Sequence, residues 1–505
     1  MKNSSRRKFL KIGLTGATGV IFTGMTKQGF VFGNSSLGGE PNDINILDFG
    51  AVGDGKKMNT TAIQKAIDTC AKKGGGRVVV PQGTFLTGSI VLKSKVNLHL
   101  LENAVLLASP YFKDFPERYV LHETRYQKYL HRTLVFAQGE NDISISGLGI
   151  LDGNVILDST GEFKEAKAEN PSLIWFDECK NITVKDVTLR RSVWWTQAYT
   201  RCCNFHADHI TVTENYFDNA DGIDIIDCED FLVENCDINS NDDGICLKGF
   251  TTTGCRRGVI RKNKVRTLCN GIKMGTDSSG GFRDIIIENN EVWQTLLSGI
   301  ALEIVDGGIM ENIIVRNITM NVVGTPIYIR LGDRNRLIYG SLTVQPGIIR
   351  NIYIGDIKAT VDKQERYNDE ERKHKLNFIP HTSSICGIPG NNIKDVTIEN
   401  IDITVIGGFP PATAEASLRE IPEKTDGYPE NRLLGILPSF GFYIRHAINV
   451  SMNNIIVTIK QQDGRPAFLL DDVHDSKFDD ISIKSITPTP AFSILQNCGG
   501  IHLSR

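Results

Sequence analysis

One short pattern of apolar and polar positions returns along the chain between about residues 175 and 320. An apolar pair is followed by a polar or charged residue, usually Asn or Asp, and then by another apolar position. Residues 181–187, 231–236, 285–290 and 313–318 are examples. If the repeats align at Val184, Val212, Val233, Ile260, Ile287 and Val315, the spacing is about 21 to 28 residues, which is the period of a solenoid protein.

Each repeat predicts two or three short strands, rich in Val, Ile and Thr and separated by Asn, Asp and Gly turns, with no helical periodicity between them. Leucine-rich repeats have a similar length, but they require regular leucines and a helical arc. A coil of parallel strands fits, because each coil buries its inward side chains only when a neighbour stacks on it at about 4.8 Å. Asn suits the recurrent turns because it tolerates left-handed backbone angles and can bond to neighbouring backbone. The predicted fold is therefore all-β, a right-handed parallel β-helix.

One convincing helix is predicted, over residues 60–73. Its apolar positions share one face, and three consecutive glycines end it at residues 74–76. The apolar positions are Ala62, Ile63, Ala66, Ile67 and Cys70. We expect this helix to cap the open N-terminal end of the coil and to protect the first strand edge.

The repeat resumes with longer gaps at residues 352–354, 396–398 and 455–457. Two segments are therefore expected to leave the coil as loops. They are residues 361–390, which are highly charged, and residues 408–438, which contain several prolines. Loops of this length beside a site can wall off one end of a cleft.

The composition bounds the size of the core and the class of partner. The 505 residues are 40% hydrophobic, so the chain can bury a large core, and a formal charge of −3 gives no general attraction to polyanions. Nucleic acid is therefore not an expected partner. Repeat architectures grow along one axis, so we expect a single β-helix catalytic domain over residues 40–505.

The N-terminus predicts export. Residues 5–11 read SRRKFLK, and a mildly apolar run follows to about residue 25, which is the order of a twin-arginine signal. Residues 1–35 are therefore predicted to be an export signal and linker, and the protein is expected to be periplasmic or extracellular. No stretch reaches the roughly 20 apolar residues that a membrane span requires, so none is expected in the mature protein.

The eleven cysteines are scattered, odd in number and without the paired spacings of a zinc site. We expect neither a disulfide framework nor a metal centre. Cys228, Cys236 and Cys246 lie on or beside apolar strand patterns, and they are predicted to fill the core as small hydrophobes.

The densest polar constellation is Asn219-Ala220-Asp221-Gly222-Ile223-Asp224, followed one coil later by Asn241-Asp242-Asp243-Gly244-Ile245. Adjacent strand residues face opposite sides, so Asp242 and Asp243 can both reach solvent only where the backbone bends, as Gly244 would allow. Crowded carboxylates raise the proton affinity of at least one of them, which lets one serve as an acid while another stays ionised. Asp and Asn are common at β-helix turns, but four acids on adjacent coils favour the chemistry of glycosidic hydrolysis.

The sequence resembles glycoside hydrolase family 28, the polygalacturonases and rhamnogalacturonan-cleaving enzymes, over most of the mature chain. The similar segments read NILDFGAVGDG at 45–55, PQGTF at 81–85, SVWWT at 192–196, GIPG at 387–390 and FYIRH at 442–446. The family's Asn-Thr-Asp motif corresponds to Asn219-Ala220-Asp221, and its Asp-Asp pair corresponds to Asp242-Asp243.

This resemblance implies hydrolysis of α-linked bonds in a pectin-type polysaccharide or its oligosaccharides, with inversion of the anomeric centre. It implies that Asp242 is the general acid and that Asp221 and Asp243 activate the water, roles that need no cofactor or metal. The two predicted loops suggest an exo-acting enzyme.

The sequence departs from the family at two motifs. Gly-His-Gly falls at Cys269-Asn270-Gly271, and Arg-Ile-Lys falls at Ala301-Leu302-Glu303, which removes the cations that hold a substrate carboxylate. Each lost charge-assisted hydrogen bond is worth about 1.5 to 3 kcal/mol. We also expect Glu303 to repel a uronate. Plain polygalacturonan is therefore not the expected substrate, and a neutral or deoxy sugar such as rhamnose, or a uronate held elsewhere, fits better.

Other cations could substitute for those that are missing, namely Lys248, Lys273, Arg330 and Arg334. The full set of predicted substrate-binding residues is Asn219, Asp224, Lys248, Asn270, Lys273, Glu303 and Arg330. Sugars also stack on aromatic rings, for which the candidates are Trp194, Trp195, Tyr199, Tyr216 and Tyr443. Alternation buries about half of a strand's positions, so any one of these rings is more often part of the core.

Two further functions stay open. Parallel β-helices also carry calcium-dependent lyases, in which acids would bind the metal and an Arg would act as base. The lost cations would also fit a non-catalytic glycan-binding protein. His206 and His209 lack the partners and spacing of a metal site or a nucleophile triad.

Overall fold

The computed structural model describes residues 43–118, 132–155, 171–215, 219–334, 346–362, 381–410, 421–485 and 493–504. All of these lie in one compact unit, Leu37–Arg505. The predicted export signal and Tyr216 fall outside the described residues. Within the described ranges, no helix has both the length and the apolar character needed to cross a membrane.

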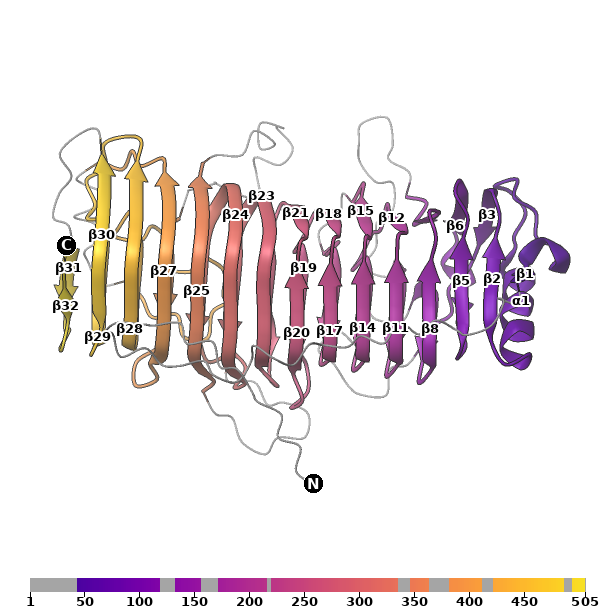
Figure 1. The fold of residues 1–505 in the computed structure, drawn as a ribbon, viewed down its shortest axis with the longest axis horizontal. Coiled ribbons are helices and arrows are strands. Elements are labelled where there is room, and N and C mark those ends of the chain that lie inside the picture. Colours follow the sequence, from indigo (N-terminus) through magenta and orange to yellow (C-terminus); the bar gives the residue numbers. More distant parts are fainter. Residues whose placement is uncertain are drawn as a thin grey trace, which may run out of the picture. The chain divides into compact units, whose positions relative to one another are not determined.

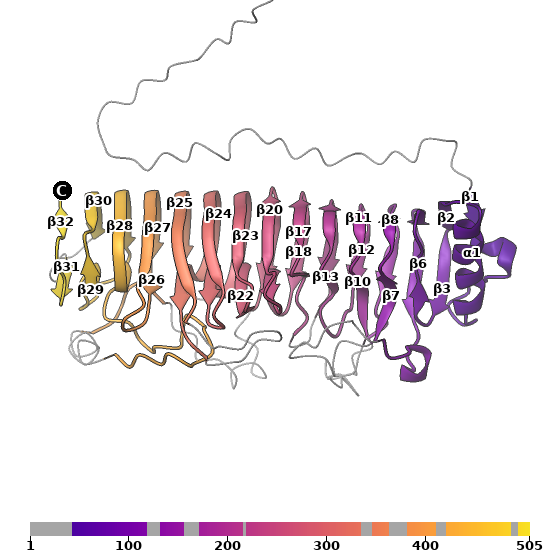
Figure 2. The same ribbon diagram turned by 90° about the horizontal axis from the view of Figure 1, so that it is seen from below.

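The strands form parallel ladders that run from coil to coil, so that neighbours in space are one coil apart in sequence (Figures 1 and 2). The first ladder consists of β1 (Asp43–Asn45), β2 (Gly76–Val80), β5 (Val96–Leu100), β8 (Asn141–Ser146), β11 (Lys180–Lys185), β14 (Cys203–Asp208), β17 (Glu229–Glu234) and β20 (Cys255–Arg261). The second consists of β3 (Gly83–Thr87), β6 (Ala104–Ala108), β9 (Ile150–Asp152), β12 (Thr188–Arg190), β15 (Thr211–Thr213), β18 (Asp237–Ser240) and β21 (Lys264–Thr267).

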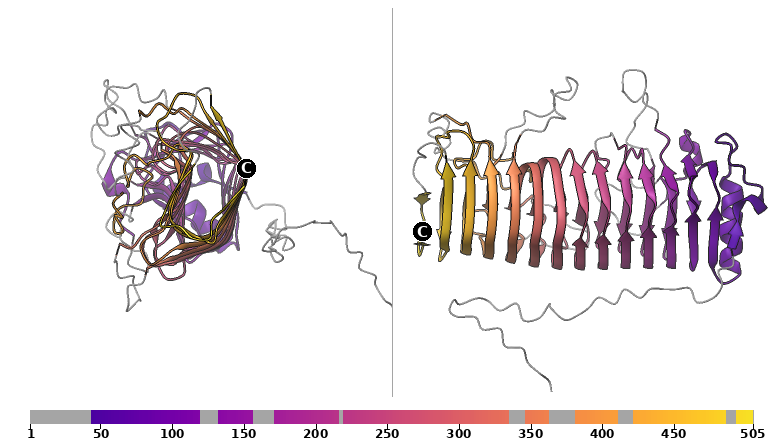
Figure 3. Two further views of the ribbon diagram at one scale, coloured as in Figure 1. Left: turned by 90° about the vertical axis from the view of Figure 1, so that its left-hand side faces the viewer. Right: turned by 45° about the horizontal axis from the view of Figure 1, so that its top comes forward.

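The third ladder carries the site described below. It consists of β4 (Ile90–Val91), β7 (Thr133–Gln138), β10 (Ser172–Asp177), β13 (Gln197–Thr200), β16 (Ile223–Ile226), β19 (Ile245–Gly249) and β22 (Ile272–Ser278). The later coils are built from β23 (Phe282–Ile304), β24 (Ile309–Leu331), β25 (Ile348–Val361), β26 (Ser383–Cys386), β27 (Ile393–Val405), β28 (Phe442–Ile459), β29 (Phe468–His474), β30 (Lys477–Ser485), β31 (Ser493–Gln496) and β32 (His502–Leu503). The ladders surround a common apolar interior, and the coils superpose when viewed along the stack (Figure 3).

The register confirms the predicted solenoid and corrects two of its alignments. Val233, Ile260, Ile287 and Val315 are successive partners in the first ladder, as predicted. Val212 is not their equivalent, because it belongs to the second ladder, and Ala207 fills the position between Val184 and Val233. Residues 455–457 likewise pair with 401–403, and the partners of residues 396–398 are 450–452. Every coil offers several apolar alternations, so the pattern alone does not identify the ladder.

The Asn-rich turns adopt the predicted left-handed conformation. Asn181, Asn204, Asn312 and Asn351 all have φ between 56° and 57°. Their amides also form a ladder between coils, in which Asn204 Nδ2 donates to Asn181 Oδ1 at 2.8 Å. Asparagine is favoured at such a turn because it tolerates positive φ and bonds to the equivalent side chain of the next coil.

Helix α1 (Thr60–Lys72) confirms the predicted helix at the N-terminal end of the stack (Figure 1). It buries Ile63, Ala66, Ile67 and Cys70 and contacts β2, β4 and β5, so it covers the first coils. Two short 3-10 helices are η1 (Ile46–Phe49) and η2 (Phe112–Asp114). The first predicted loop is partly wrong, because β26 lies within residues 361–390 and pairs with β24 and β28.

Candidate active site

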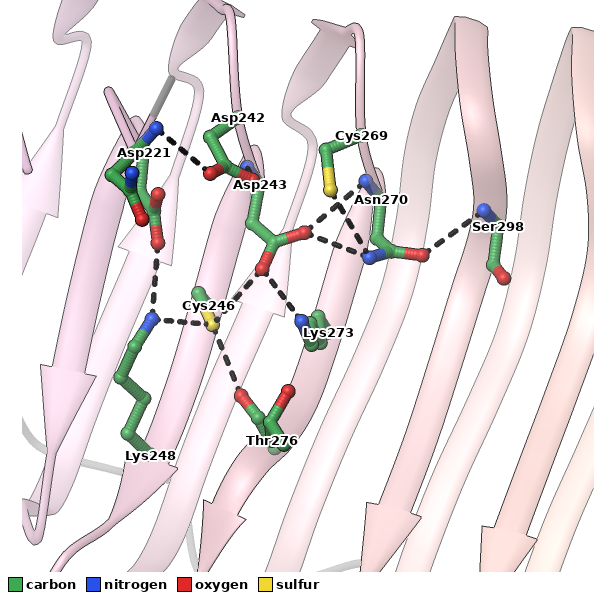
Figure 4. A network of polar contacts seen from close by, with 12 residues as sticks. Asp221, Asp242, Asp243, Cys246, Lys248, Cys269, Asn270, Lys273, Thr276 and Ser298 are labelled. Carbon is green, nitrogen blue, oxygen red and sulfur yellow. Dashed lines mark hydrogen bonds and ion pairs between the residues drawn. The ribbon is translucent and has the colours of Figure 1, made fainter. Parts of the chain in front are cut away.

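The acidic residues lie where the chain turns from the second ladder into the third. Asp221 precedes β16, and Asp242 and Asp243 lie between β18 and β19. The odd-numbered residues Ile223, Ile225, Ile245 and Leu247 pack in the central core. Alternation therefore directs Asp224, Cys246 and Lys248 to the outer face of the third ladder, where the acids also gather (Figure 4). Cys246 is thus buried as predicted but does not fill the core, whereas Cys228 and Cys236 do.

Glycines let successive coils approach closely at this turn. A Cβ on Gly244 would lie 2.3 Å from Val265 Cγ1 and 2.5 Å from the Gly271 carbonyl oxygen. Gly222 is equally confined, with the Gly244 oxygen 2.5 Å from its Cβ position. The Ile245 amide donates to the Gly271 carbonyl at 3.0 Å, so the turns are stacked by hydrogen bonds. Gly244 is therefore required by close packing between coils.

Lys248 joins the acids of neighbouring coils. Its Nζ donates to Asp221 Oδ2 at 3.0 Å and to Asp224 Oδ1 at 2.5 Å. It also contacts Cys246 Sγ at 2.9 Å and lies 4.6 Å from the ring centre of Trp195. Burial lowers the pKa of Lys248, but Asp221 and Asp224 outweigh burial and raise it, so the ammonium stays charged. Burial is also the main cause that raises the pKa of Asp221, and it raises that of Asp224 to about 6.

Asp243 is held as a carboxylate by two neighbours. Asn270 Nδ2 donates to Asp243 Oδ1 at 2.8 Å, and the Asn270 amide donates to the same oxygen at 3.2 Å. Lys273 Nζ donates to Asp243 Oδ2 at 2.9 Å. Burial raises the pKa of Asp243, but Lys273 and Lys248 together outweigh burial and lower it to about 2. Asn270, where the family has histidine, therefore fixes the orientation of this acid.

Asp242 has a different environment. It is partly exposed, and its carboxyl oxygens accept from the amides of Asn219 and Asp243, each at 2.9 Å. No described lysine or arginine pairs with it. Desolvation raises its pKa to about 7, and the charges of Asp221 and Asp243 add to the effect. Two adjacent residues thus hold opposite protonation states near pH 5, which is the division of labour that acid–base catalysis requires.

Glu303 differs from its predicted role. It lies on the outer face of β23 with 0% exposure, and no described residue hydrogen-bonds to either carboxyl oxygen. Burial raises its pKa to about 8, against the opposing effect of Lys273. A protonated Glu303 carries no charge, so repulsion of a uronate is expected only above about pH 8. Full burial also means that Glu303 does not contact substrate in this conformation.

Among the described residues, neither Arg330 nor Arg334 forms a hydrogen bond or ion pair with Asp221, Asp242 or Asp243. Arg330 is buried and donates to the carbonyls of Gly387 at 3.2 Å and Glu423 at 2.7 Å, so it anchors two chain segments. Arg334 pairs with Asp306, to which its Nε donates at 2.9 Å. Both arginines therefore bond to protein groups and lie nearer to Glu303 than to the three aspartates, because Arg330 is the register partner of Glu303 and Arg334 opposes the rise in the pKa of Glu303.

The predicted aromatic platforms are mostly packed. Tyr199 is fully buried and stacks on Phe205, with ring centres 3.8 Å apart, so it belongs to the core, as expected for most of these rings. Tyr443 is buried in an apolar cluster with Leu434 and Leu437. Trp194 and Trp195 stack on one another at 6.0 Å in a separate cluster on the outer face. His206 pairs with Glu234, and together with Asp208 these residues form a group of possible ligand atoms, so His206 has partners that the sequence did not predict. His209 pairs with Asp208 just after β14.

The cluster balances its charge by protonation. Five carboxyl groups, those of Asp221, Asp224, Asp242, Asp243 and Glu303, share the outer face with the two ammonium groups of Lys248 and Lys273. If all were ionised the buried cluster would carry excess negative charge, which desolvation opposes. Desolvation of such a cluster favours uptake of protons, and the pKa values of Asp221, Asp242 and Glu303 are all raised, in the direction that this imbalance requires.

The described residues contain four groups of ligand atoms that could approach a metal ion, and two of them lie at this site. Asp221, Asp224 and Cys246 form one, and Asp242, Asp243 and Cys269 form the other, with the atoms of each group within 4.8 Å of one another. Lys248 and Lys273 already contact carboxylates in these two groups. A divalent cation would therefore face an ammonium group in either position, so the residues present fit a calcium site poorly.

Sequence reasoning missed Tyr428. It lies in the segment between β27 and β28, and Lys273 Nζ lies 5.6 Å from its ring centre. The side chain is 47% exposed. A single proline-rich segment gives no signal of which surface it will cover, because that depends on tertiary contacts far along the chain.

Comparison with known proteins gives a consistent result. Residues 70–408 match the model of glycosyl hydrolases family 28. A probable polygalacturonase from Vitis vinifera is 30% identical over 317 residues, which cover 57% of this chain and 63% of the relative. An exo-poly-alpha-D-galacturonosidase from Dickeya chrysanthemi is 26% identical over 308 residues, 50% of this chain and 51% of the relative. The chain thus spans between about half and two thirds of these relatives' length.

The fold is similar to that of an exopolygalacturonase from Thermotoga maritima. The TM-score is 0.63 at 22% sequence identity, and the match covers 83% of this chain and 93% of the other. This likeness concerns the fold alone.

Proposed function

The chain belongs to family 28 of the glycosyl hydrolases, and on that basis we propose that it hydrolyses α-linked bonds in a pectin-type polysaccharide or its oligosaccharides. One observation carries the proposal. Asp242 and Asp243 are adjacent in sequence, yet their pKa values are moved apart to about 7 and about 2. Between these values the first is a proton donor and the second a proton acceptor, as glycosidic hydrolysis requires.

In this mechanism Asp242 is the general acid. It gives its proton to the glycosidic oxygen as the bond from that oxygen to the anomeric carbon breaks. A water molecule attacks the anomeric carbon from the opposite face and loses a proton to Asp243. Asp221, held by Lys248 at 3.0 Å, would orient the water. The proton taken up by Asp243 then passes to solvent, and Asp242 is reprotonated.

Inversion is the expected stereochemistry, although the spacing of the acids is short. One carboxyl oxygen of Asp242 and one of Asp243 lie within 4.8 Å of each other, below the roughly 6.5 to 9.5 Å that typically separates the carboxyl groups of inverting enzymes. Asp243, however, has one oxygen bonded to Asn270 and the other to Lys273. A carboxylate committed in this way is a weak nucleophile but a well-oriented base, which supports attack by water.

The proposed substrate is not plain polygalacturonan. Lys248 and Lys273 are paired with aspartates, and Arg330 and Arg334 are engaged elsewhere in the protein. A substrate carboxylate would have to compete for these cations. A neutral or deoxy sugar at the cleavage subsite, as in rhamnogalacturonan, avoids that competition.

We further propose exo action and export. Described residues 421–438 cross the outer face near the acids, where Arg330 holds them, and such a segment can close one end of a cleft. The twin-arginine sequence at residues 5–11 supports a periplasmic or extracellular location. Release of a single small product from a long polymer, before its viscosity falls, would support the exo mode.

The test is a panel of pectic oligosaccharides incubated with the purified protein, with and without EDTA. New reducing ends that are insensitive to EDTA and lack ultraviolet absorbance from unsaturated products are the expected result. Absorbance that chelation abolishes would instead indicate a calcium-dependent lyase. If no oligosaccharide of the panel is cleaved but one of them binds, the result would contradict hydrolysis and favour a glycan-binding protein.

A further inference from the structure

The segment between β27 and β28 is fixed to the outer face on both sides of Tyr428. Before it, Arg445 Nη1 donates to the Ile421 carbonyl and Arg330 Nη2 to the Glu423 carbonyl, each at 2.7 Å. After it, Leu434 and Leu437 pack against the buried ring of Tyr443. Tyr428 is therefore carried by an anchored segment, and its position beside the acids is built into the fold.

The two ends of the Tyr428 side chain have different surroundings. The hydroxyl lies near Lys273, Asp243 and Thr276. Lys273 lowers the pKa of this hydroxyl, but burial of the hydroxyl and the Asp243 charge together raise it, so the phenol stays protonated. Nearly half of the side chain is nevertheless exposed. A tyrosine with a polar tip inside a site and an open ring at its edge suits the binding of an amphipathic ligand such as a sugar.

The other aromatic groups of the site do not offer such a surface. Trp194 and Trp195 are more than nine-tenths buried, and Tyr199 and Tyr443 are packed. Among the described residues, the large exposed aromatic side chains are Tyr111, Trp293 and Tyr428, and only Tyr428 contacts a residue that pairs with a candidate catalytic acid.

We propose that Tyr428 is a specificity-determining residue that contacts substrate, and that the exposed part of its ring supports the apolar face of the sugar next to the scissile bond. This inference rests on the proposed function and names the ligand chemistry of the same site. The favoured sugar is a pyranose without a carboxylate at this position, and a 6-deoxy sugar gains most because its methyl group adds apolar area against the ring.

The charged residues near Tyr428 also favour a sugar without a carboxylate. The ammonium of Lys273, which lies by the Tyr428 ring, is already bonded to Asp243 at 2.9 Å. Glu303, also near Lys273, offers no positive charge. A uronate stacked on Tyr428 would therefore meet no uncommitted cation among these residues, whereas a deoxy sugar would need none.

The chain contains a matched control. Tyr111 is 61% exposed and has Lys113 Nζ 5.4 Å from its ring centre, so it repeats the tyrosine–lysine arrangement in another part of the surface. Replacement of Tyr111 removes an exposed ring and a similar lysine contact, and among the described residues Tyr111 makes no hydrogen bond or ring contact with the acidic cluster. Any general effect of losing such a pair would appear in both variants.

The experiment measures binding in a background that cannot turn over. Asp242→Asn, alone and combined with Tyr428→Ala, Tyr428→Phe or Tyr111→Ala, is titrated by calorimetry with a rhamnogalacturonan hexasaccharide and with trigalacturonic acid. We expect Tyr428→Ala to weaken binding of the hexasaccharide about five- to tenfold, the loss of one stacking contact. Tyr428→Phe and Tyr111→Ala should stay within about twofold, and trigalacturonic acid should bind more weakly throughout.

The outcomes separate this inference from the proposed hydrolysis. Unchanged affinity in Tyr428→Ala, or equal losses in Tyr428→Ala and Tyr428→Phe, would overturn the stacking role. Tighter binding of trigalacturonic acid than of the hexasaccharide would overturn the ligand class. If the wild-type protein cleaves neither glycan but its binding depends on the Tyr428 ring as expected, the result would contradict the hydrolase proposal and support the stacking role of Tyr428. Melting temperatures within a few degrees show that each variant is folded.

Discussion

Replacement of Lys273 by methionine tests the electrostatic basis of the proposed mechanism. Methionine keeps much of the side-chain volume but removes the ammonium that contacts Asp243 Oδ2 at 2.9 Å. At that distance and an effective dielectric constant of about 20, the Coulomb interaction is about 6 kcal/mol, or about four pKa units. Asn270 and Lys248 remain, so we expect the pKa of Asp243 to rise by roughly two to four units from about 2.

The consequence is a change in the pH profile. Asp243 must be ionised to accept a proton, so its raised pKa moves the acid limb of kcat/KM upward, toward about pH 5. The alkaline limb is set by Asp242, whose pKa of about 7 limits the protonated form. The wild-type protein should keep nearly full activity at pH 4 relative to pH 6, whereas the variant should lose about tenfold over the same interval.

The assay is the initial rate of reducing-end release between pH 3 and pH 9, with Lys113→Met as a surface control. The ratio of activities at pH 4 and pH 6 is the informative quantity, because it cancels any uniform loss caused by substrate contacts of Lys273. An acid limb that coincides with that of the wild type would refute the claim that Lys273 keeps Asp243 ionised.

Three further predictions concern stability and stereochemistry. Glu303→Gln should leave the melting temperature unchanged near pH 4 and raise it at pH 8. The pKa of Glu303 is about 8 in the folded protein and about 4.3 in the unfolded chain, so the wild-type protein loses stability as the pH rises above about 4.3, and the variant does not. Equal melting temperatures of variant and wild type at pH 8 would contradict the raised pKa. Gly244→Ala should lower the free energy of unfolding by about 1 to 3 kcal/mol or prevent folding, since its Cβ would lie 2.3 Å from Val265 Cγ1; denaturant titration measures the loss, and wild-type stability would show that the coils have room there. Proton NMR of the first product should show the anomer opposite to the bond cleaved, and retention would indicate that Asp243 attacks directly.

The repeat pattern was sufficient to predict the fold, because stacking of coils forces apolar side chains to recur at a fixed period. It did not identify the ladder of Val212, since each coil contains several similar alternations and register depends on neighbouring coils. The grouping of Asp221, Asp242 and Asp243 followed from the same stacking, whereas their individual protonation depends on cations supplied by later coils, such as Lys273.

Burial explains most of the differences between the predicted and the observed roles of the site residues. Cys246 was assigned to the core from its apolar strand pattern, and Glu303 to the substrate site from its place in the Arg-Ile-Lys motif, but the face of the strand and the segment that covers it decide what each residue does. Arg330 was expected to bind substrate and instead donates to main-chain carbonyls more than fifty residues away in sequence. Tyr428 carried no local signal, because its position is fixed by contacts of its segment with β24 and β28.

The most direct test of the central claim is reducing-end release by Asp242→Asn at pH 5, on the oligosaccharide that the wild type cleaves fastest. The amide keeps the shape of the side chain but cannot donate the acidic proton, so the account predicts a loss of about 10²- to 10⁴-fold with an unchanged melting temperature. A folded variant with a rate close to that of the wild type would contradict the assignment of Asp242 as the general acid.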